Sequence, residues 1–364
     1  MANSFQDSVF LHIQDTKETS FRVLSTEMKQ NLDRDLSTAE NRAINKAIHI
    51  YKSQTRSELA VDSEKDKGDL QFVVVTAYTD NYQVGKICEE VNRQYAAFHG
   101  YEFVSRVTTY KHMMEVLHPK SNAAWYKILY FLELFEEFGA RADQPETYFV
   151  WIDADALVVD NSIKLEDIAR RAKKRELIIA EDVSICCPVN AGVFLLKYCE
   201  WSKTFLQEVW TCDKYDKVSF FEQSAIIRYL KLQGEGLNVL YKPFHSYIPG
   251  AFQGDKLFEH VAVLPHWALN SNRGITREEL KGYNFLEIGD EDDLDFECFS
   301  SNGADTDATL CDGDKQIFLF HPAGAKNKIL YIIASVYKYD IEMTKVLRQS
   351  IADTGISLRL SVDM

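Results

Sequence analysis

Two carboxylates stand two positions apart, Asp153 and Asp155, where the apolar run of YFVWIDADALVVD at 148–160 ends. Side chains at i and i+2 of an extended segment point to the same face, so both can converge on one positively charged object. Paired carboxylates with open coordination positions suit Mg²⁺ or Mn²⁺, which typically bridge a protein to substrate phosphates. The pair therefore predicts a divalent metal site that holds a diphosphate ligand.

The plainer interpretation is that these carboxylates cap a helix or pair with basic neighbours, because acidic pairs at loop starts are common. The metal is favoured by the preceding apolar run, which predicts a buried strand whose end is fixed at the sheet edge.

Composition narrows the classes of function. With 364 residues, 46% of them hydrophobic, the chain can bury a large core as one or two domains. A net charge of −14 argues against a nucleic-acid or anionic-membrane partner. No apolar stretch approaches the roughly 18 to 20 residues that span a bilayer, and no signal peptide is evident. Seven cysteines without a framework spacing indicate reduced thiols. We therefore expect a cytoplasmic protein, unless a native anchor lies outside this sequence.

From residue 70 onward the pattern alternates between strands and helices, which predicts an α/β fold with a mainly parallel, Rossmann-like sheet flanked by helices. In such sheets ligands bind beyond the carboxyl ends of the strands, where Asp153 and Asp155 should lie. The predicted strands cover 70–78, 101–107, 148–152, 176–182, 190–198, 237–244 and 315–324, and the predicted helices 84–99, 123–139, 201–210 and 221–232.

Two metal-dependent chemistries use such an acidic pair. One is a phosphatase of the haloacid dehalogenase type, in which Asp153 would attack phosphate, Asp155 would act as acid and base, and the run 289–293 would be the late acidic motif. Against it, that motif normally ends the first strand of its core and has Thr or Val where this chain has Leu157.

The other chemistry is sugar transfer from a nucleotide diphosphate. Six motifs follow one another along the chain: VVVTAYTDNY (73–82), WYKI (125–128), WIDADALVVD (151–160), VNAGVFLLKYCEWSKTFL (189–206), FFEQSAI (220–226) and FLFHPAGAKNK (318–328). In these motifs and their order, the chain resembles GT-A glycosyltransferases, most closely the retaining family 34 of galactosyl-, mannosyl- and xylosyltransferases. The resemblance covers roughly residues 70 to 335.

The resemblance implies a metal-dependent enzyme that moves a sugar with retention from a UDP- or GDP-sugar to a glycan or glycoprotein. Asp153 and Asp155 would hold Mn²⁺ or Mg²⁺, and His321 would be the third protein ligand, a role that suits a neutral imidazole and Mn²⁺. A non-catalytic nucleotide-sugar or glycan-binding module on the same fold is a further alternative.

The other implied site residues surround the donor. Gly324 would let the backbone approach a phosphate, and Lys326 or Lys328 would neutralise it; Asn327 occupies the family's lysine position, so either lysine remains a candidate. Gln223 and Glu222 resemble the family's amide and acidic residue beside the reacting sugar, although they also fit a simple helix start.

Further candidates for donor contacts follow from their positions. Asn190 would bond a sugar hydroxyl, or else form a turn. Thr76, Ala77 and Tyr78, at the end of the first strand, would meet the base, with Tyr78 stacked on it. Lys127 would reach a phosphate or donor sugar, unless it is simply solvated. The loop 264–271 combines aromatic and polar residues, as sugar-binding loops do, with His266, Trp267 and Asn270.

The chain is expected to divide into three parts. Residues 1–68 read as a helical extension and linker that packs beside the next part or mediates self-association. Residues 69–335 would form the GT-A catalytic domain, with an acidic loop insertion at 289–314. Residues 336–364 would pack on that domain.

Overall fold

The computed structural model describes residues 69–139, 145–182, 187–218, 220–232, 254–271 and 317–323, together with two short strands, Tyr283–Phe285 and Leu358–Leu360, and positions 328, 332 and 335. Several predictions from sequence lie outside these residues: the extension 1–68, the strand 237–244, the acidic insertion 289–314, Gly324, Lys326, and most of 336–364.

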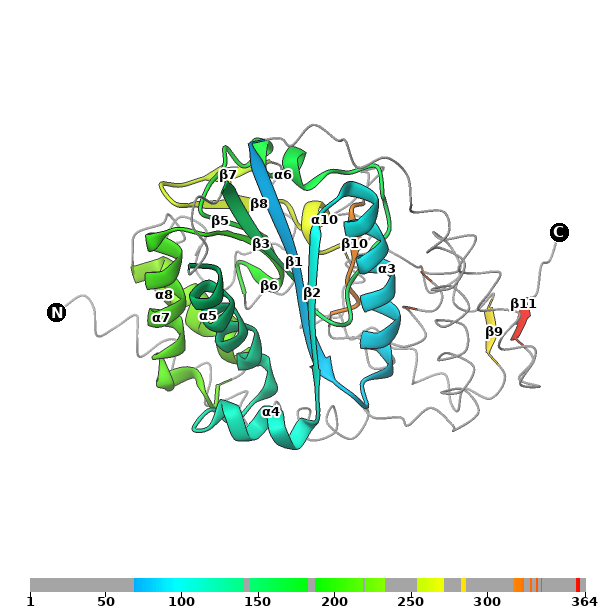
Figure 1. Ribbon diagram of the computed structural model, residues 1–364, viewed down its shortest axis with the longest axis horizontal. Coiled ribbons are helices and arrows are strands. Elements are labelled where there is room, and N and C mark those ends of the chain that lie inside the picture. Colours follow the sequence, from blue (N-terminus) through cyan, green and yellow to red (C-terminus); the bar gives the residue numbers. More distant parts are fainter. Residues whose placement is uncertain are drawn as a thin grey trace, which may run out of the picture.

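A seven-stranded mixed sheet forms the centre of the fold (Figure 1). Its order is β2-β1-β3-β6-β5-β8-β7, from β1 (Leu70–Thr79), β2 (Glu102–Thr108), β3 (Glu146–Ile152), β5 (Leu177–Ala180), β6 (Asn190–Lys197), β7 (Lys256–Leu257) and β8 (Val261–Leu264). β2, β1, β3, β5 and β8 run in one direction, whereas β6 and β7 are antiparallel to their neighbours. The sheet is thus mixed and mostly parallel, as predicted in its coarse outline.

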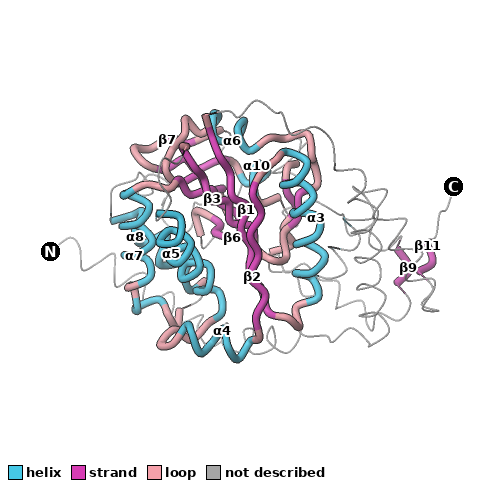
Figure 2. The backbone as a smooth tube through the Cα atoms, viewed as in Figure 1, coloured by secondary structure: helices cyan, strands magenta, loops and turns pink. Residues whose placement is uncertain are grey.

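Helices cover both faces of this sheet (Figure 2). One face carries α5 (Tyr126–Gly139), preceded by the short η1 (Ala123–Trp125), and α7 (Glu200–Trp210) and α8 (Phe221–Leu232). The other face carries α3 (Gln83–His99), α6 (Leu165–Arg171) and α10 (His266–Leu269). Also described are α4 (Tyr110–Leu117) and η2 (Asp213–Tyr215). Among the described helices, none is both long and apolar enough to cross a bilayer.

The central strand β3 shows why the sheet needs helices on both sides. Its residues alternate between two hydrophobic clusters, with Phe149 and Trp151 packed toward α5 and α7 and Tyr148, Val150 and Ile152 toward α3 and α6. Side chains of a strand alternate between its faces, so an uninterrupted apolar run needs two cores. Packing between the two hydrophobic clusters holds β3 in place and thereby positions the residues that follow its last residue, Ile152.

Two further pairings bring distant segments to the carboxyl end of β3. Because β6 is antiparallel to β3, its first residues, not its last, lie there: Val193 pairs with Ile152, and the Asp153 N–H donates to the Gly192 carbonyl at 2.8 Å. A separate two-stranded sheet pairs β4 (Leu157–Val158) with β10 (Leu319–Phe320). A second two-stranded sheet pairs β9 (Tyr283–Phe285) with β11 (Leu358–Leu360).

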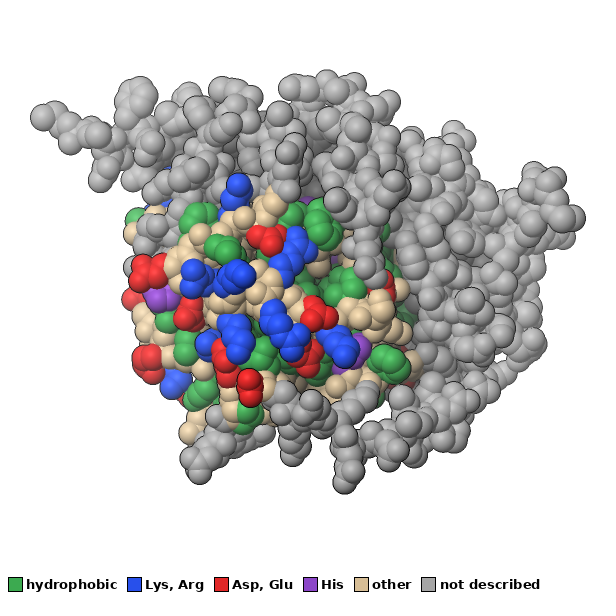
Figure 3. Space-filling model, turned by 90° about the horizontal axis from the view of Figure 1, so that it is seen from above, with side chains coloured by type: hydrophobic (Ala, Val, Ile, Leu, Met, Phe, Trp, Pro, Cys, Tyr) green, Lys and Arg blue, Asp and Glu red, His purple; other side chains and the backbone are tan. Residues whose placement is uncertain are grey.

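The end of the sheet at which β3 begins is rich in charges of both signs. Glu146, the first residue of β3, pairs with Lys197 at 2.7 Å and Lys174 at 3.3 Å, and Arg171 of α6 pairs with Asp255. Seen from above, the side on which α6 lies in Figure 1, the described surface shows basic and acidic side chains next to one another (Figure 3). Among the described residues, charges of both signs therefore lie side by side at this end.

Candidate active site

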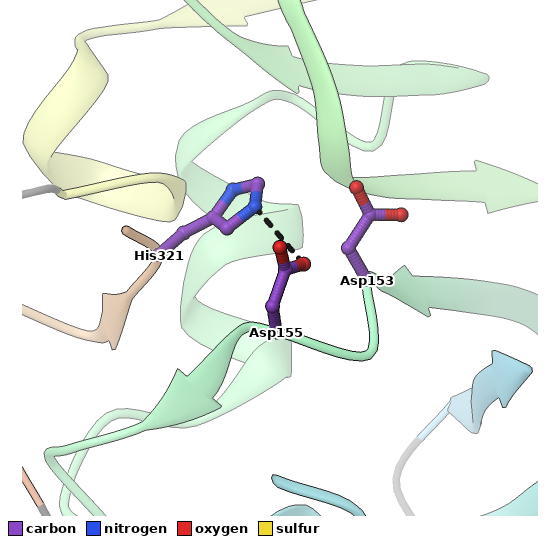
Figure 4. A group of neighbouring side chains, drawn as sticks. All are labelled: Asp153, Asp155 and His321. Carbon is purple, nitrogen blue, oxygen red and sulfur yellow. Dashed lines mark ion pairs between the residues drawn. The ribbon is translucent and has the colours of Figure 1, made fainter. Parts of the chain in front are cut away.

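Two carboxylates and an imidazole converge beyond the carboxyl end of β3 (Figure 4). Asp153 and Asp155 lie in the turn between β3 and β4, and His321 follows β10. One ligand atom from each lies within 4.8 Å of the other two. The structure thus brings together the three residues that the sequence suggested as metal ligands.

The short β4–β10 sheet accounts for the approach of His321. Phe320 pairs with Leu157, so the next residue, His321, falls beside the turn that carries Asp155. On the other side of β10, the Ser271 carbonyl accepts the His321 N–H at 2.8 Å. The imidazole is buried, with Nδ1 3.0 Å from Asn270 Oδ1 and Nε2 3.3 Å from Asp155 Oδ1.

Asp155 is the most heavily engaged of the three. Besides His321, its carboxylate pairs with the ammonium group of Lys328 and accepts a hydrogen bond from the Tyr82 hydroxyl. Burial alone would raise the pKa of Asp155, but Lys328 and His321 outweigh it and hold the pKa well below its ordinary value. Burial, and then the neighbouring Asp155 charge, raise the pKa of Tyr82. Asp155 is therefore ionised, and the ammonium group of Lys328 already faces it.

Asp153 belongs to a second charged group centred on Lys127 of α5. The Lys127 ammonium lies 3.0 Å from Asp153 Oδ1, from Glu222 Oε1 and from the Ala191 carbonyl. Burial alone would lower the pKa of Lys127, but the two carboxylates raise it above its ordinary value. An ammonium has three N–H donors, and all three have an acceptor here. The predicted contact of Lys127 with a phosphate or donor sugar stays a prediction, and it requires one acceptor to be released.

Glu222 has one engaged and one unengaged oxygen. Oε1 binds Lys127, whereas the buried Oε2 has no hydrogen-bond partner among the described residues. Burial raises the pKa of Glu222, Lys127 lowers it, and Asp153 raises it further, so that the net direction is upward. A buried acceptor without a partner is costly, which makes Oε2 a candidate contact for a ligand hydroxyl.

Asp182, just after β5, connects two of the predicted sugar contacts. Its Oδ2 accepts from Asn190 Nδ2 at 3.2 Å and from Gln223 Nε2 at 3.1 Å. The carbonyl ends of those two amides accept the N–H groups of Gly192 and Ala191, each at 2.8 Å. Gln223 and Asn190 are therefore held at both ends of their side chains, beside the start of β6.

The residues predicted to meet a nucleotide base lie in β1, which continues to Thr79. Thr76 is buried, and Ala77 is partly buried. The Tyr78 ring packs on Gly85, and its hydroxyl donates to Glu89. Base stacking on Tyr78 stays a prediction, as does the role of Gly324 and Lys326, which lie outside the described residues.

Sequence reasoning missed several residues of this site. Tyr82 stands at the end of VVVTAYTDNY, so its place shortly after a strand was the available signal. Asn92 of α3 donates to the Ala156 carbonyl and accepts the Val158 N–H, both at 2.9 Å, and so fixes the segment after Asp155. Asp182 likewise ends a predicted strand. Nothing in the sequence around Asn92 indicates that a polar side chain there is buried.

Fold and site together define a class: an α/β protein that gathers two carboxylates and an imidazole at the end of a central strand, a set of ligand atoms that could hold a divalent cation. Among known proteins, residues 71–185 match the model of the galactosyl transferase GMA12/MNN10 family.

Two curated plant proteins are similar to part of the chain. Galactomannan galactosyltransferase 1 of Cyamopsis tetragonoloba is 30% identical over 123 residues, covering 32% of this chain and 25% of the relative. Putative glycosyltransferase 7 of Arabidopsis thaliana is 29% identical over 161 residues, covering 40% of this chain and 34% of the relative. The similarity thus spans between a quarter and about a third of these relatives' lengths.

Two solved structures are also similar. One is a glycosyltransferase involved in the glycosylation of the major capsid of PBCV-1, at 15% identity and a TM-score of 0.39, covering 55% of this chain and 84% of that one. The other is the apo structure of the bifunctional glycosyltransferase WbbM, at 12% identity and a TM-score of 0.37, covering 78% of this chain and 52% of that one.

Proposed function

We propose that the protein is a metal-dependent retaining glycosyltransferase that moves a sugar from a UDP- or GDP-sugar to a glycan or glycoprotein. The observation that carries the proposal is the convergence of Asp153, Asp155 and His321 within 4.8 Å, in a chain whose residues 71–185 match the galactosyl transferase GMA12/MNN10 family. Because one relative is named a galactomannan galactosyltransferase, galactose and a galactomannan are the first sugar and acceptor to test.

The donor set fits the implied cation. Two carboxylate oxygens and one imidazole nitrogen are ligands that Mn²⁺ accepts, while Mg²⁺ favours oxygen alone. When the neutral imidazole carries its proton on Nδ1, His321 Nε2 and the Asp155 carboxylate face one another as acceptors, and a cation between them would reconcile the two. A divalent ion held there would act as a Lewis acid for the negative charge of a departing diphosphate.

The residues around Lys127 would bind and orient the donor sugar. Glu222 Oε2 is positioned to accept a hydrogen bond from a sugar hydroxyl, and in doing so it would gain the partner it lacks among the described residues. The Gln223 amide, held by Asp182 and the Ala191 N–H, would present a fixed dipole to the reacting face of the sugar. Such groups stabilise developing positive charge without reorganising during the reaction.

Lys328 would serve the diphosphate end of the donor. Its ammonium pairs with Asp155, so it lies within reach of a phosphate bound beside that carboxylate. Retention places the acceptor hydroxyl on the face from which the diphosphate leaves, and an oxygen of the departing phosphate would then take its proton. This route needs no separate base from the protein.

The test combines donor binding with product analysis. Thermal shift is measured with UDP- and GDP-sugars, with and without Mn²⁺, and transfer is then assayed with the stabilising donor. We expect one nucleotide to raise the midpoint only when Mn²⁺ is present, by mass action on the folded state. Asp155→Asn should abolish both this stabilisation and transfer.

Three outcomes would contradict the proposal. A metal-independent ligand that Asp155→Asn still binds would indicate a non-catalytic binding module. Release of inorganic phosphate without a glycosyl product, with Asp153 trapped by a phosphate mimic, would indicate the phosphatase chemistry instead. If no UDP- or GDP-sugar shifts the midpoint of thermal unfolding in the presence of Mn²⁺, these nucleotide sugars are excluded as donors.

A further inference from the structure

Asn270 connects the end of α10 to the imidazole of His321. Its N–H donates to the His266 carbonyl at 3.0 Å, as the last turn of α10 closes, and its side chain is only 2% exposed. The sequence suggested a sugar contact for this residue, but the side chain reaches His321 instead. It therefore acts on the site through another residue.

The two ends of the Asn270 amide are chemically distinct, and the surroundings decide which end faces the ring. Nδ2 donates to the Val193 carbonyl at 3.4 Å, a group that can only accept. Oδ1 consequently faces His321 Nδ1 at 3.0 Å, and an amide oxygen can only accept. The short contact is favourable only if Nδ1 carries the proton.

A proton on Nδ1 leaves the lone pair of the neutral ring on Nε2. That nitrogen is the one that faces Asp155, 3.3 Å from Oδ1, and it belongs to the group of three ligand atoms. Metal-binding histidines usually donate their other ring N–H to an oxygen, which fixes the tautomer and the ring orientation. Asn270 supplies that oxygen from a side chain anchored on β6.

We propose that Asn270 is a positioning residue for the metal site: it holds His321 in the tautomer and orientation that present Nε2 to a divalent cation. The role of Asn270 in metal binding rests on the proposed function, whereas its effect on the tautomer of His321 does not. Val193, to which Asn270 is anchored, pairs with Ile152 at the end of β3. Asn270 thereby aligns the histidine with the strand that carries the two aspartates.

The experiment compares Asn270→Ala and Asn270→Asp with wild type by two readouts. The first is the tautomer of His321 in metal-free protein, from the ¹⁵N chemical shifts of labelled histidine, with His321→Gln to assign the signal. We expect the Nδ1–H tautomer in wild type and in Asn270→Asp, which keeps an acceptor, and a mixture in Asn270→Ala.

The second readout is the dissociation constant of Mn²⁺ alone, by titration calorimetry. We expect Asn270→Ala to weaken it by roughly 10- to 100-fold, the usual loss for an outer partner of a metal-bound histidine, and Asn270→Asp by less than about tenfold. Phe205→Leu, in the core on the opposite face of the sheet, controls for stability and should leave the Mn²⁺ affinity unchanged.

An unchanged tautomer and unchanged Mn²⁺ affinity in Asn270→Ala would overturn the inference. So would an equal loss of affinity in Phe205→Leu, because the effect would then follow stability. The first readout needs no metal: if wild type fails to bind Mn²⁺ while its tautomer still depends on Asn270, the proposed function fails and the positioning of His321 stands.

Discussion

The backbone of Gly192 lies directly against the imidazole of His321. A Cβ at position 192 would be 2.3 Å from His321 Cε1 and 2.6 Å from Nδ1, and 2.8 Å from Asn190 Oδ1. A Cβ atom essentially never lies within 3.0 Å of an atom to which it is not bonded, so any side chain at 192 must displace the ring or the strand. Glycine is needed here for a close approach and not for its backbone angles.

Gly192→Ala should therefore damage the metal site through His321. We expect a loss of about 1–3 kcal/mol in the free energy of unfolding from overpacking, and a 10-fold or greater loss of Mn²⁺ affinity, measured by urea denaturation and calorimetry. Gly254→Ala is the matched control, since no atom of the described residues lies within 4 Å of its added Cβ, and it should change stability by less than about 0.5 kcal/mol. Equal behaviour of the two variants would refute the packing argument.

Lys127 is expected to be critical because it separates two carboxylates. Lys127→Met removes the cation between Asp153 and Glu222 and leaves their charges facing each other, at a cost of about 3 kcal/mol in the free energy of unfolding. Urea denaturation measures this loss. A donor-dependent thermal shift should disappear in the same variant.

A double-mutant cycle tests whether the cost comes from the unpaired charge. Adding Glu222→Gln to Lys127→Met should restore part of the stability, giving a coupling energy above about 1 kcal/mol. Lys203→Met, which removes a lysine paired with Glu200 at 3.5 Å on the surface of α7, should cost less than about 1 kcal/mol. A purely additive cycle would mean that Lys127 acts by packing alone.

Lys328 and a divalent ion should compete for Asp155. Without nucleotide, Lys328→Met is expected to bind Mn²⁺ more tightly, because the ion no longer displaces an ammonium group. With Mn²⁺ and UDP together, the same variant should bind the nucleotide about tenfold more weakly, as the loss of about 1.4 kcal/mol from one phosphate contact predicts. Calorimetry with Mn²⁺ alone and then with UDP separates the two effects.

The companion variant Lys326→Met decides between the two lysines that the sequence offers. If Lys326→Met weakens UDP binding and Lys328→Met does not, the diphosphate contact belongs to Lys326.

The pH dependence of stability should reflect the lowered pKa of Asp155. A carboxyl whose pKa is lower in the folded state stabilises the fold above its unfolded pKa of about 3.9, and this contribution is lost as the pH falls through the folded value. The free-energy difference between wild type and Asp155→Asn should thus be constant from about pH 5 to 7 and shrink below about pH 4. Urea denaturation at each pH provides the measurement; a difference that grows on acidification would contradict it.

Much of the fold could be predicted because its signals are local. The apolar run before Asp153 gave β3, and the apolar stripe ended by glycine gave α5, with boundaries close to those observed. The direction of β6 has no such signal, because a buried strand has the same apolar sequence pattern whether it runs parallel or antiparallel to its neighbours. Yet that direction brings Asn190 and Gly192 beside Asp153.

The site was predictable in its residue types and not in its contacts. Asp153, Asp155 and His321 were suggested by motif order, and the structure brings them together. The attachment of Lys127 to two carboxylates, and of Asn270 to His321, depends on which elements pack against one another. Such tertiary pairings are set by the whole fold, so a helical lysine and a loop asparagine look ordinary in the sequence.

The short β4–β10 sheet joins two segments of the chain that the ribosome synthesises at well-separated times. Lys328 and Asp155 are 173 positions apart, and His321 arrives on the same late segment. A ribosome that has released the aspartates must still add most of the second half before the imidazole exists, so a nascent chain cannot assemble the ion site early. Loss of that late segment to a protease would leave Asp155 without the ammonium group of Lys328 and the site without its nitrogen ligand, and a captured ion should in turn shield the segment from cleavage.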